Sequence, residues 1–364
     1  MTRTVTAVVT GVGGGVGQSV IKGLNLSMER KGDIEYRIVG TDADVFASGL
    51  YRVDKGYVVP KADEDGYLER LTEIIDEEDA DILIPGSDPE VLRVAEGRRK
   101  IVSECDVEVL VSSEEAVRIG LDKWETFRYL DRNGFSTPLT VLSEGADEIV
   151  EEAGFPLVVK PRTGSASRGM FVATDKEELS YALDHSPEPV VQEYLVPRNW
   201  DGDLDRNDLE KQVDEYSTEI IVSKDGEVIN SLANWRKMDK GVPSVAKVKP
   251  HDEIREACEE VAEDLDVVGP VNLQTRVTEE GPTFFEINTR FTGSTAVRCV
   301  AGFNGPDTMI RNLVLDEEID KSYLEFDNLV EMRYKDEVYI TEEEYSRVRD
   351  EGVAENGGET HDYY

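Results

Sequence analysis

The amino-acid sequence predicts a chain of two parts, an α/β domain with a parallel sheet and a larger α+β region that follows it. Two observations carry this prediction. From residue 4 to about 111, short β-branched runs alternate with helical patterns, which is typical of a parallel sheet with helices on both faces. From about residue 189, longer strands follow one another. A length of 364 residues accommodates two or three domains.

In the first part, five strands are expected at residues 4–10, 36–42, 56–60, 81–85 and 107–111. Polar or glycine-rich turns follow three of them, 10-TGVGGGVG-17, 41-TDAD-44 and 86-GSDPE-90. The carboxyl ends of parallel strands meet at one edge of a sheet, where ligands bind. We therefore expect Gly14, Ser87, Asp88 and Glu90 to face one crevice. There they contact a substrate, or the glycine turn only packs a strand against a helix.

The second part is expected to begin with an amphipathic helix at residues 121–134, which ends at Asn133-Gly134. Strands are then expected at residues 139–142, 155–160 and 170–174. A polar glycine loop, 163-TGSASRG-169, joins the last two strands, so that they form a hairpin able to close over a ligand.

The rest of the chain is expected to hold longer strands, at residues 189–195, 216–223, 227–236, 271–277 and 283–290. An acidic stretch at 198–212 is interpreted as an inserted surface loop. A helix near 306–315, a hairpin around 329–340, a final helix and a frayed tail from 354 to 364 complete the prediction. The expected domain bounds are 1–112, 113–315 (with a lid subdomain at about 135–188) and 316–364.

Charge distinguishes this sequence, because 78 Asp and Glu oppose 40 Lys and Arg and give a formal net charge of −38. The acids are spread along the chain between regular apolar segments, which indicates a folded protein with an acidic surface rather than a disordered tail. Self-repulsion of this size favours a protein adapted to high intracellular salt, a halophile's protein, over an ordinary acidic cytosolic one. Nucleic acid is not expected as a partner.

Cysteine, histidine and hydropathy exclude several classes of site. The three cysteines are far apart in the sequence and are expected to be buried apolar residues, not disulfides or zinc ligands. The three histidines are equally scattered, which disfavours a histidine metal cluster. No leader and no apolar run of about 20 residues is found, so a cytoplasmic protein that does not bind a membrane is expected.

The opening turn fits T-G-x-x-G-x-x-G, a spacing used by extended short-chain dehydrogenases, and Asp42 ends the second strand, where such proteins hold a ribose. Such an enzyme also needs a Tyr-x-x-x-Lys pair. The early match, 51-YRVDK-55, comes before the third strand, which is too early. An NAD(P)-dependent oxidoreductase is therefore an alternative function only.

Cations and glycines downstream suit a nucleoside triphosphate. Lys123 opens a helix and Lys160 ends a buried strand. The loop after Lys160 supplies backbone and hydroxyl donors at Thr163, Gly164, Ser165, Ser167 and Gly169. The strand end formed by Gln192, Glu193, Tyr194 and Leu195 is expected to read adenine, and Glu215 to accept ribose hydroxyls. Each charge taken alone is also compatible with a solvated surface.

Two late strands predict a metal site. Alternate residues of a strand face the same side, so Glu286, Asn288 and Arg290 project together, near Gln274 of the neighbouring strand. Gln274, Glu286 and Asn288 offer the oxygen ligands that Mg²⁺ prefers, and Mn²⁺ is an alternative. Arg290 is expected to stabilise a transferred phosphoryl group.

Taken together, these motifs resemble the ATP-grasp enzymes, closest to the branch of the carbamoyl-phosphate synthetase large subunit and biotin carboxylase, over roughly residues 4–315. The resemblance implies a Rossmann-like pre-ATP-grasp domain followed by a two-lobed ATP-grasp fold. It also implies that Lys123 and Lys160 contact the ATP phosphates under the 163–169 loop and that Arg290 clamps the phosphoryl or acyl phosphate. Adenosine would contact Glu193 to Leu195 and Glu215, and Mg²⁺ would bind Gln274, Glu286 and Asn288.

The implied activity is that of a carboxylate–amine or carboxylate–thiol ligase, which forms an acyl phosphate and releases ADP and phosphate. Carbamoyl-phosphate synthetases carry two ATP-grasp units and a second arginine where this chain has Gly293, which argues against carbamoyl phosphate synthesis. Arg236 and Arg298 are expected to hold a larger carboxylate. A non-catalytic ATP-binding module is a further alternative, and a homodimer is the expected assembly.

Overall fold

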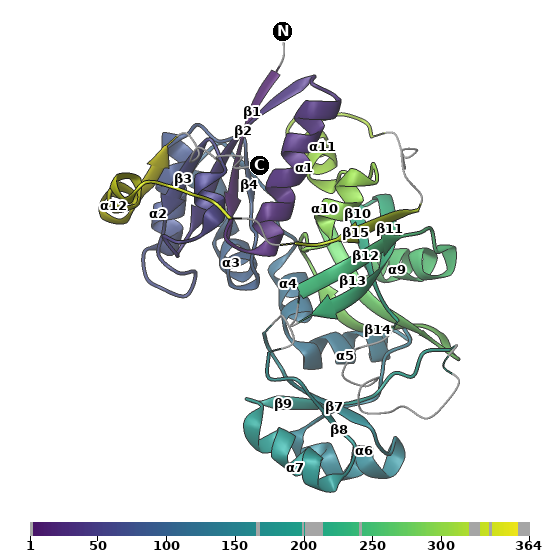
Figure 1. Cartoon of the computed structure of the whole chain (residues 1–364). Coiled ribbons are helices and arrows are strands. Elements are labelled where there is room, and N and C mark those ends of the chain that lie inside the picture. The colour runs from purple at the N-terminus through teal and green to yellow at the C-terminus, as the bar shows by residue number, and fades with distance from the viewer. Residues whose placement is uncertain are drawn as a thin grey trace.

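The computed structural model describes residues 3–164, 168–198, 200, 214–239, 242–319, 328–334 and 337–355. Its strands form three sheets, one in an N-terminal domain and two in the region that follows (Figure 1). The predicted fold class, a parallel-sheet domain followed by antiparallel sheets, is confirmed. No helix in the described ranges has both the length and the apolar character needed to cross a membrane.

The N-terminal domain holds a six-stranded sheet in the order β16-β3-β2-β1-β4-β5. Strands β1 to β5 are parallel, and β16 alone pairs antiparallel, with β3. The elements are β1 (Arg3–Thr10), α1 (Gly15–Arg30), β2 (Ile34–Asp42), the 3-10 helix η1 (Ser48–Tyr51), β3 (Lys55–Val58), α2 (Tyr67–Glu77), β4 (Ile82–Ile84), α3 (Asp88–Glu104) and β5 (Glu108–Val109).

Alternation along β1 explains how this sheet is covered on both faces. Val5, Ala7 and Val9 lie in a buried cluster with α1 and with apolar residues of the following region. Val8 faces the other way, into a cluster with α2 and α3. Six of the eight β1 residues are buried, as expected of a central parallel strand.

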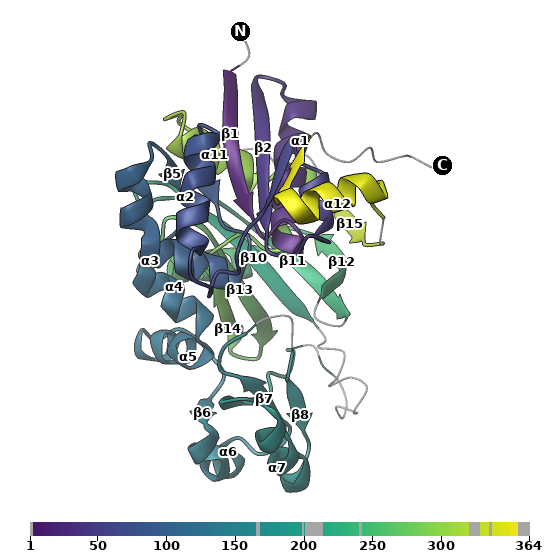
Figure 2. The same cartoon turned by 90° about the vertical axis from the view of Figure 1, so that its left-hand side faces the viewer.

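The central antiparallel sheet has the order β14-β13-β10-β11-β12-β15. Figure 2 shows it below the N-terminal domain and above the small lobe. Its elements and the helices around it are α4 (Glu114–Leu121), α5 (Lys123–Arg132), β10 (Glu215–Val222), β11 (Val228–Asp239), β12 (Val242–Val248), α9 (Asp252–Asp264), β13 (Gly269–Thr278), β14 (Gly281–Asn288), α10 (Thr295–Val300), α11 (Gly305–Leu313) and β15 (Leu329–Met332).

The third sheet, in the order β6-β9-β7-β8, forms a small lobe on the far side of α5 from the N-terminal domain (Figure 1). Its core contains Ile149, Leu157, Val159 and Val191. The lobe consists of β6 (Thr140–Leu142), the 3-10 helix η2 (Ser143–Gly145), α6 (Ala146–Glu152), β7 (Leu157–Pro161), β8 (Phe171–Ala173), α7 (Lys176–His185) and β9 (Pro189–Glu193). The predicted hairpin at 155–174 is present as the antiparallel pair of β7 and β8.

Two predictions about the C-terminal segment are wrong. The expected hairpin around 329–340 is instead a single strand, β15, which pairs with β12 at the edge of the central sheet. Of the tail expected to fray from 354, Ala354 and Glu355 instead belong to β16 (Val353–Glu355), which follows α12 (Glu342–Glu351) and pairs with β3. Local alternation looks the same whether the partner strand is near or far in the sequence, which is why both were misread.

Several other predictions fall partly or wholly on residues that the structure does not describe. The acidic stretch 198–212 lies almost wholly outside the described residues, as do residues 356–364 of the tail. The domain bounds stay a prediction. All three cysteines are buried and unbridged, as expected.

Candidate functional site

A cleft lies between the small lobe and the central sheet. From the small lobe it is lined by Val158, Lys160, Val172 and the end of β9, and from the central sheet by residues of β10, β11, β13 and β14. The cleft brings together residues predicted separately, namely Lys123, Lys160, Thr163, Gly164, Gln192, Glu193, Tyr194, Leu195, Glu215, Arg236, Gln274 and Glu286.

Two lysines give one end of the cleft a positive charge. Lys123 is the first residue of α5, and its Nζ donates to the carbonyl oxygen of Gly164 at 2.8 Å. Lys160, near the end of β7, is buried. Burial, and then the charge of Lys123, lower the pKa of Lys160 to about 8. The Lys160 ammonium therefore lacks strong compensation, which a polyphosphate would provide.

Glu286 lies at the centre of the predicted metal ligands. Its Oε1 accepts from Gln274 Nε2 at 2.8 Å and from Asn288 Nδ2 at 3.0 Å. Register explains the first contact, because Gln274 of β13 lies directly opposite Glu286 of β14. Burial opposes ionisation of Glu286, but Lys123, Asn288 and Lys160 outweigh it and lower the pKa of the carboxyl group. The group is therefore a carboxylate at neutral pH.

These three side chains fit a hard cation that also binds phosphate oxygens. The described residues contain no group of three or more His, Cys, Asp and Glu side chains able to hold a metal. One carboxylate and two amide oxygens suit Mg²⁺ only if phosphate and water complete its shell, which is its usual behaviour in nucleotide sites. The arrangement thus favours a metal that binds with the nucleotide.

The end of the cleft where adenine is expected, called the base end, is formed by the residues at the end of β9. Gln192 Nε2 donates to Thr140 Oγ1 at 2.8 Å, and Glu193 Oε2 accepts from the backbone of Leu139 at 3.2 Å. Tyr194 and Leu195 are buried. The glutamine and glutamate side chains thus bind the neighbouring strand β6 and the residue before it, and all four residues from Gln192 to Leu195 line the cleft.

Glu215 and Arg236 both line the cleft, but they bind each other. They are cross-strand neighbours in β10 and β11, and Glu215 Oε1 accepts from Arg236 Nε at 2.6 Å and also from Nη2. Both side chains are buried. Glu215 was predicted to bind ribose hydroxyls and Arg236 to bind a carboxylate substrate. The structure instead pairs the two side chains with each other, so neither acts alone.

Two predicted parts of the phosphate loop cannot be placed, and one lies beside the cleft. Ser165 and Ser167 are outside the described residues. Gly169 has φ of +70°, a left-handed conformation that favours glycine, and a Cβ there would lie 3.0 Å from Pro161. The glycine is therefore required by the turn between β7 and β8.

Arg290 is outside the lining of the cleft and faces the N-terminal domain. Its Nε and Nη2 lie 2.6 and 2.5 Å from Asp88 Oδ1, and its Nη1 donates to the carbonyl oxygen of Phe291. Asp88 opens α3 at the carboxyl edge of the parallel sheet. Ser87 and Glu90, its neighbours, bind each other through Ser87 Oγ at 2.6 Å. The contact between Asp88 and Arg290 thus joins the N-terminal domain to the segment after β14, and the crevice expected there stays a prediction.

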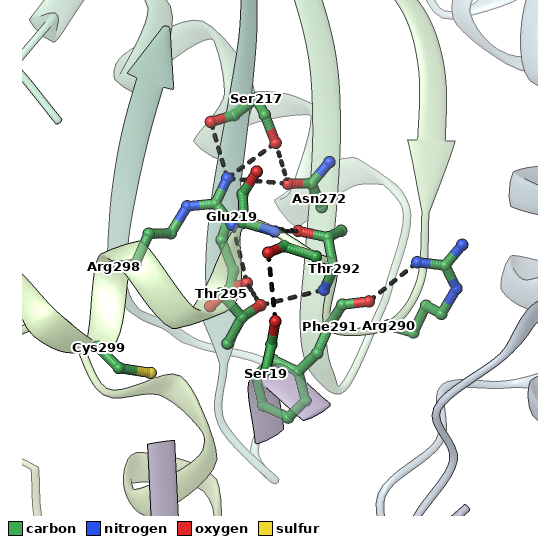
Figure 3. A network of polar contacts seen from close by, with 12 residues as sticks. Ser19, Ser217, Glu219, Asn272, Arg290, Phe291, Thr292, Thr295, Arg298 and Cys299 are labelled. Atoms are coloured by element: carbon green, nitrogen blue, oxygen red, sulfur yellow. Dashed lines mark hydrogen bonds and ion pairs between the residues drawn. The ribbon is translucent and has the colours of Figure 1, made fainter. Parts of the chain in front are cut away.

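The prediction that Arg298 holds a carboxylate substrate is wrong. Its side chain is fully buried in the network of Figure 3. It donates to Glu219 Oε2 at 3.0 Å and to the carbonyl oxygen of Ser217 at 2.8 Å. Thr295 also donates to Glu219 Oε2. Because α10 turns Arg298 inward, this arginine anchors the segment after Arg290 and has no surface to offer a ligand.

The glycine turn after β1 is closely packed at Gly13, whereas Gly14 and Gly15 are exposed, so a substrate contact at Gly14 stays a prediction. A Cβ on Gly13 would lie 2.7 Å from Ala47 Cβ, and one on Gly49 would lie 2.0 Å from the carbonyl oxygen of Val12. Asp42 Oδ2 accepts from the backbone N–H of Gly13 at 2.7 Å. The residue needed for a nicotinamide ribose is therefore bonded to the turn itself. Gly14 is less confined, with the carbonyl oxygen of Gly11 at 3.3 Å from its Cβ position.

Sequence reasoning missed several residues at the site. The cleft is also lined by Arg168, Met170, Met238, Arg276 and Phe285. Arg276 was detectable, since it lies two residues after Gln274 on a strand and so shares its face. Arg333 was not detectable. Its Nη2 donates to the carbonyl oxygen of Gly293, and its Nη1 lies 3.6 Å from the Cβ position of Gly293.

Comparison with known proteins agrees with this geometry. Residues 210–337 match a family model described as ATP-grasp in the biosynthetic pathway with Ter operon, and residues 16–110 match one described as PylC-like, N-terminal domain. The carbamoyl phosphate synthase large chain of Pyrococcus furiosus is 22% identical over 287 residues. That match covers 74% of this chain and 26% of the relative, so this chain spans about a quarter of its length.

Solved structures show the fold. N5-carboxyaminoimidazole synthetase from Staphylococcus aureus, complexed with ADP, superposes with a TM-score of 0.71 at 16% identity, over 92% of this chain and 83% of the other. The biotin carboxylase domain of Hydrogenobacter thermophilus 2-oxoglutarate carboxylase, in complex with MgADP, ADP and bicarbonate, gives 0.63 at 17% identity, over 87% and 71%. These structures share the fold of this chain, while the family models report similarity of residues 210–337 to an ATP-grasp family and of residues 16–110 to a PylC-like N-terminal domain.

Proposed function

We propose that the protein is an ATP- and Mg²⁺-dependent ligase that activates a carboxylate as an acyl phosphate and joins it to an amine. The cleft carries this proposal, because Lys123 and Lys160 line the same cavity as Glu286 and its amide partner Gln274. Asn288 also donates to the Glu286 carboxylate. The similar ADP-bound folds support the nucleotide.

Each group has a role that follows from its position. Lys123 and Lys160 bind the phosphates of ATP and balance their charge. Gln274, Glu286 and Asn288 hold Mg²⁺, which would neutralise charge on the β- and γ-phosphate oxygens. The carboxylate oxygen of the substrate bonds to the γ-phosphorus while the bond from that phosphorus to the ADP oxygen breaks. The amine nitrogen then bonds to the acyl carbon as phosphate leaves.

The carboxylate is proposed to bind beyond the cleft, where Arg290 and Arg333 flank the segment from Phe291 to Gly293. The two guanidinium groups come from different elements, the end of β14 and the end of β15. Guanidinium groups recognise carboxylates and phosphates by paired hydrogen bonds. Carbamoyl-phosphate synthetases have an arginine where this chain has Gly293. Arg333, whose Nη1 lies 3.6 Å from the Cβ position of Gly293, is proposed to supply that positive charge instead.

The test is release of ADP from Mg-bound ATP in mixtures of carboxylates and amines. Glu286→Gln should abolish release, because it removes the one charged metal ligand, while its unfolding midpoint stays that of the wild type. Glu280→Gln, at the exposed turn before β14, is the control and should release ADP normally. Turnover by Glu286→Gln at the wild-type rate would contradict the proposal. ATP binding without turnover in any mixture would favour a regulatory module.

A further inference from the structure

Two buried polar atoms at the base end of the cleft have no partner among the described residues. They are Nε of Arg276 and the hydroxyl group of Tyr194. Both side chains are more than nine-tenths buried, and both residues line the cleft. The two side chains are in contact, because the Arg276 guanidinium carbon lies 5.0 Å from the centre of the Tyr194 ring. A buried donor without an acceptor is costly, and a cationic donor more so.

The rest of the Arg276 side chain is firmly held. Its Nη1 donates to the carbonyl oxygen of Leu195 at 2.9 Å, so β13 is tied to the end of β9. Arginine stays protonated at all relevant pH values, so the unpaired Nε–H cannot be relieved by loss of a proton. One donor of this cleft-lining side chain therefore has no acceptor among the described residues, and a ligand that binds in the cleft can supply the lone pair.

Position along β13 indicates which part of a nucleotide supplies that lone pair. Gln274, opposite Glu286, marks the metal and phosphate end. Arg276 is two residues further on the same face, about 7 Å along the strand, and contacts the Tyr194–Leu195 segment instead. A nucleoside triphosphate whose phosphates contact Lys123 and Lys160 would extend its nucleoside towards Arg276.

We infer that Arg276 is a nucleotide-recognition residue that donates from Nε to an acceptor atom of the nucleoside half of the bound nucleotide. The inference rests on the proposed nucleotide site but not on the chemistry performed there. It assigns the nucleoside contact to a charged side chain, in addition to the backbone at the end of β9. It gives Arg276 a role different from that of Lys123 and Lys160, which are proposed to contact the phosphates.

Calorimetric titration of ADP and of inorganic tripolyphosphate tests the inference without turnover. In Arg276→Met, ADP affinity should fall at least tenfold, while tripolyphosphate affinity stays within twofold of the wild type. Arg276→Lys is the decisive variant, because its ammonium keeps the charge and can reach the Leu195 carbonyl oxygen but offers no second fixed donor. It should lose ADP affinity to a similar extent. Arg349→Met, on the exposed face of α12, is the matched control.

The outcomes are separable. Loss of ADP and tripolyphosphate affinity by the same factor would overturn the inference, because Arg276 would then act on phosphate or on the cleft as a whole. Full ADP affinity in Arg276→Lys would also overturn it, since the contact to Leu195 would then suffice. If wild-type protein binds neither ligand, the proposed function itself fails. If Arg276→Met does not fold, Arg276→Lys gives the answer alone.

Discussion

Glu90→Gln should remove one cause of the loss of folding stability with rising pH, which lies in the N-terminal domain. Glu90 is 7% exposed, and its Oε2 lies 2.6 Å from the Cβ position of Gly11 in the glycine turn. Burial, with a smaller effect of Asp42, raises the pKa of this carboxyl group from an ordinary 4.5 to about 7, although the Ser87 hydroxyl group opposes the shift. The folded protein thus holds a proton on Glu90 at pH values where the unfolded chain has released it.

The sign and size follow from this difference. A raised carboxyl pKa means that the folded state loses stability as pH rises, from the unfolded value near 4.5 up to the folded value near 7. The whole effect is about 3 kcal/mol, at 1.36 kcal/mol for each pKa unit. About 2 kcal/mol of it falls between pH 5.5 and pH 8.5. Glutamine stays neutral throughout, so the variant should not lose this contribution.

The assay is urea unfolding at pH 5.5 and pH 8.5 in concentrated KCl, with the free energy of unfolding compared between variant and wild type. The many other acids titrate in both proteins, so the difference between the two isolates Glu90. Relative to wild type, Glu90→Gln should gain about 2 kcal/mol on going to pH 8.5. Glu104→Gln, exposed at the other end of α3, should gain nothing. Parallel pH dependence in Glu90→Gln and wild type would refute the reasoning.

Three further predictions concern the cleft and the network behind it. The affinity for ADP should fall as pH rises above about 8, where Lys160 loses its proton, and Lys160→Arg should abolish that fall in calorimetric titrations. Asp88→Asn should slow carboxylate-dependent ADP release at least tenfold without changing ADP affinity, because Asp88 holds Arg290; equal rates would contradict this role. Arg298→Met should cost about 3–5 kcal/mol in urea unfolding, since it leaves Glu219 unpaired, and adding Glu219→Met should recover part of the loss.

The contacts that sequence reasoning predicted depend on strand periodicity. Glu286 and Asn288 alternate on β14, and Gln274 follows the same rule on β13, so one face of two strands could be assembled from the sequence. Lys160 was recognisable because a lysine ended an apolar run. These features are local, and local rules describe them well.

Register and long-range pairing limited the prediction elsewhere. Glu215 and Arg236 are opposite each other because β10 and β11 pair in one register, which shifts at a bulge between Ile221 and Val222. A bulge changes which residues face each other and leaves no clear signal in the sequence. Arg298 was misread for a related reason, since its partner Glu219 lies 79 positions away on another element.

The packing of α1 explains why the parallel-sheet domain matters to a site that lies mainly outside it. Asp307 of α11 is buried and accepts from Ser27 at 2.7 Å, from Lys31 at 2.7 Å and from Tyr36 at 2.6 Å, all in the N-terminal domain. This network fixes the two regions against each other. From this domain, Asp88 reaches the segment after β14 by binding Arg290. A substrate carboxylate that binds Arg290 would therefore meet a guanidinium group already oriented by Asp88, which is why Asp88→Asn is expected to slow carboxylate-dependent ADP release.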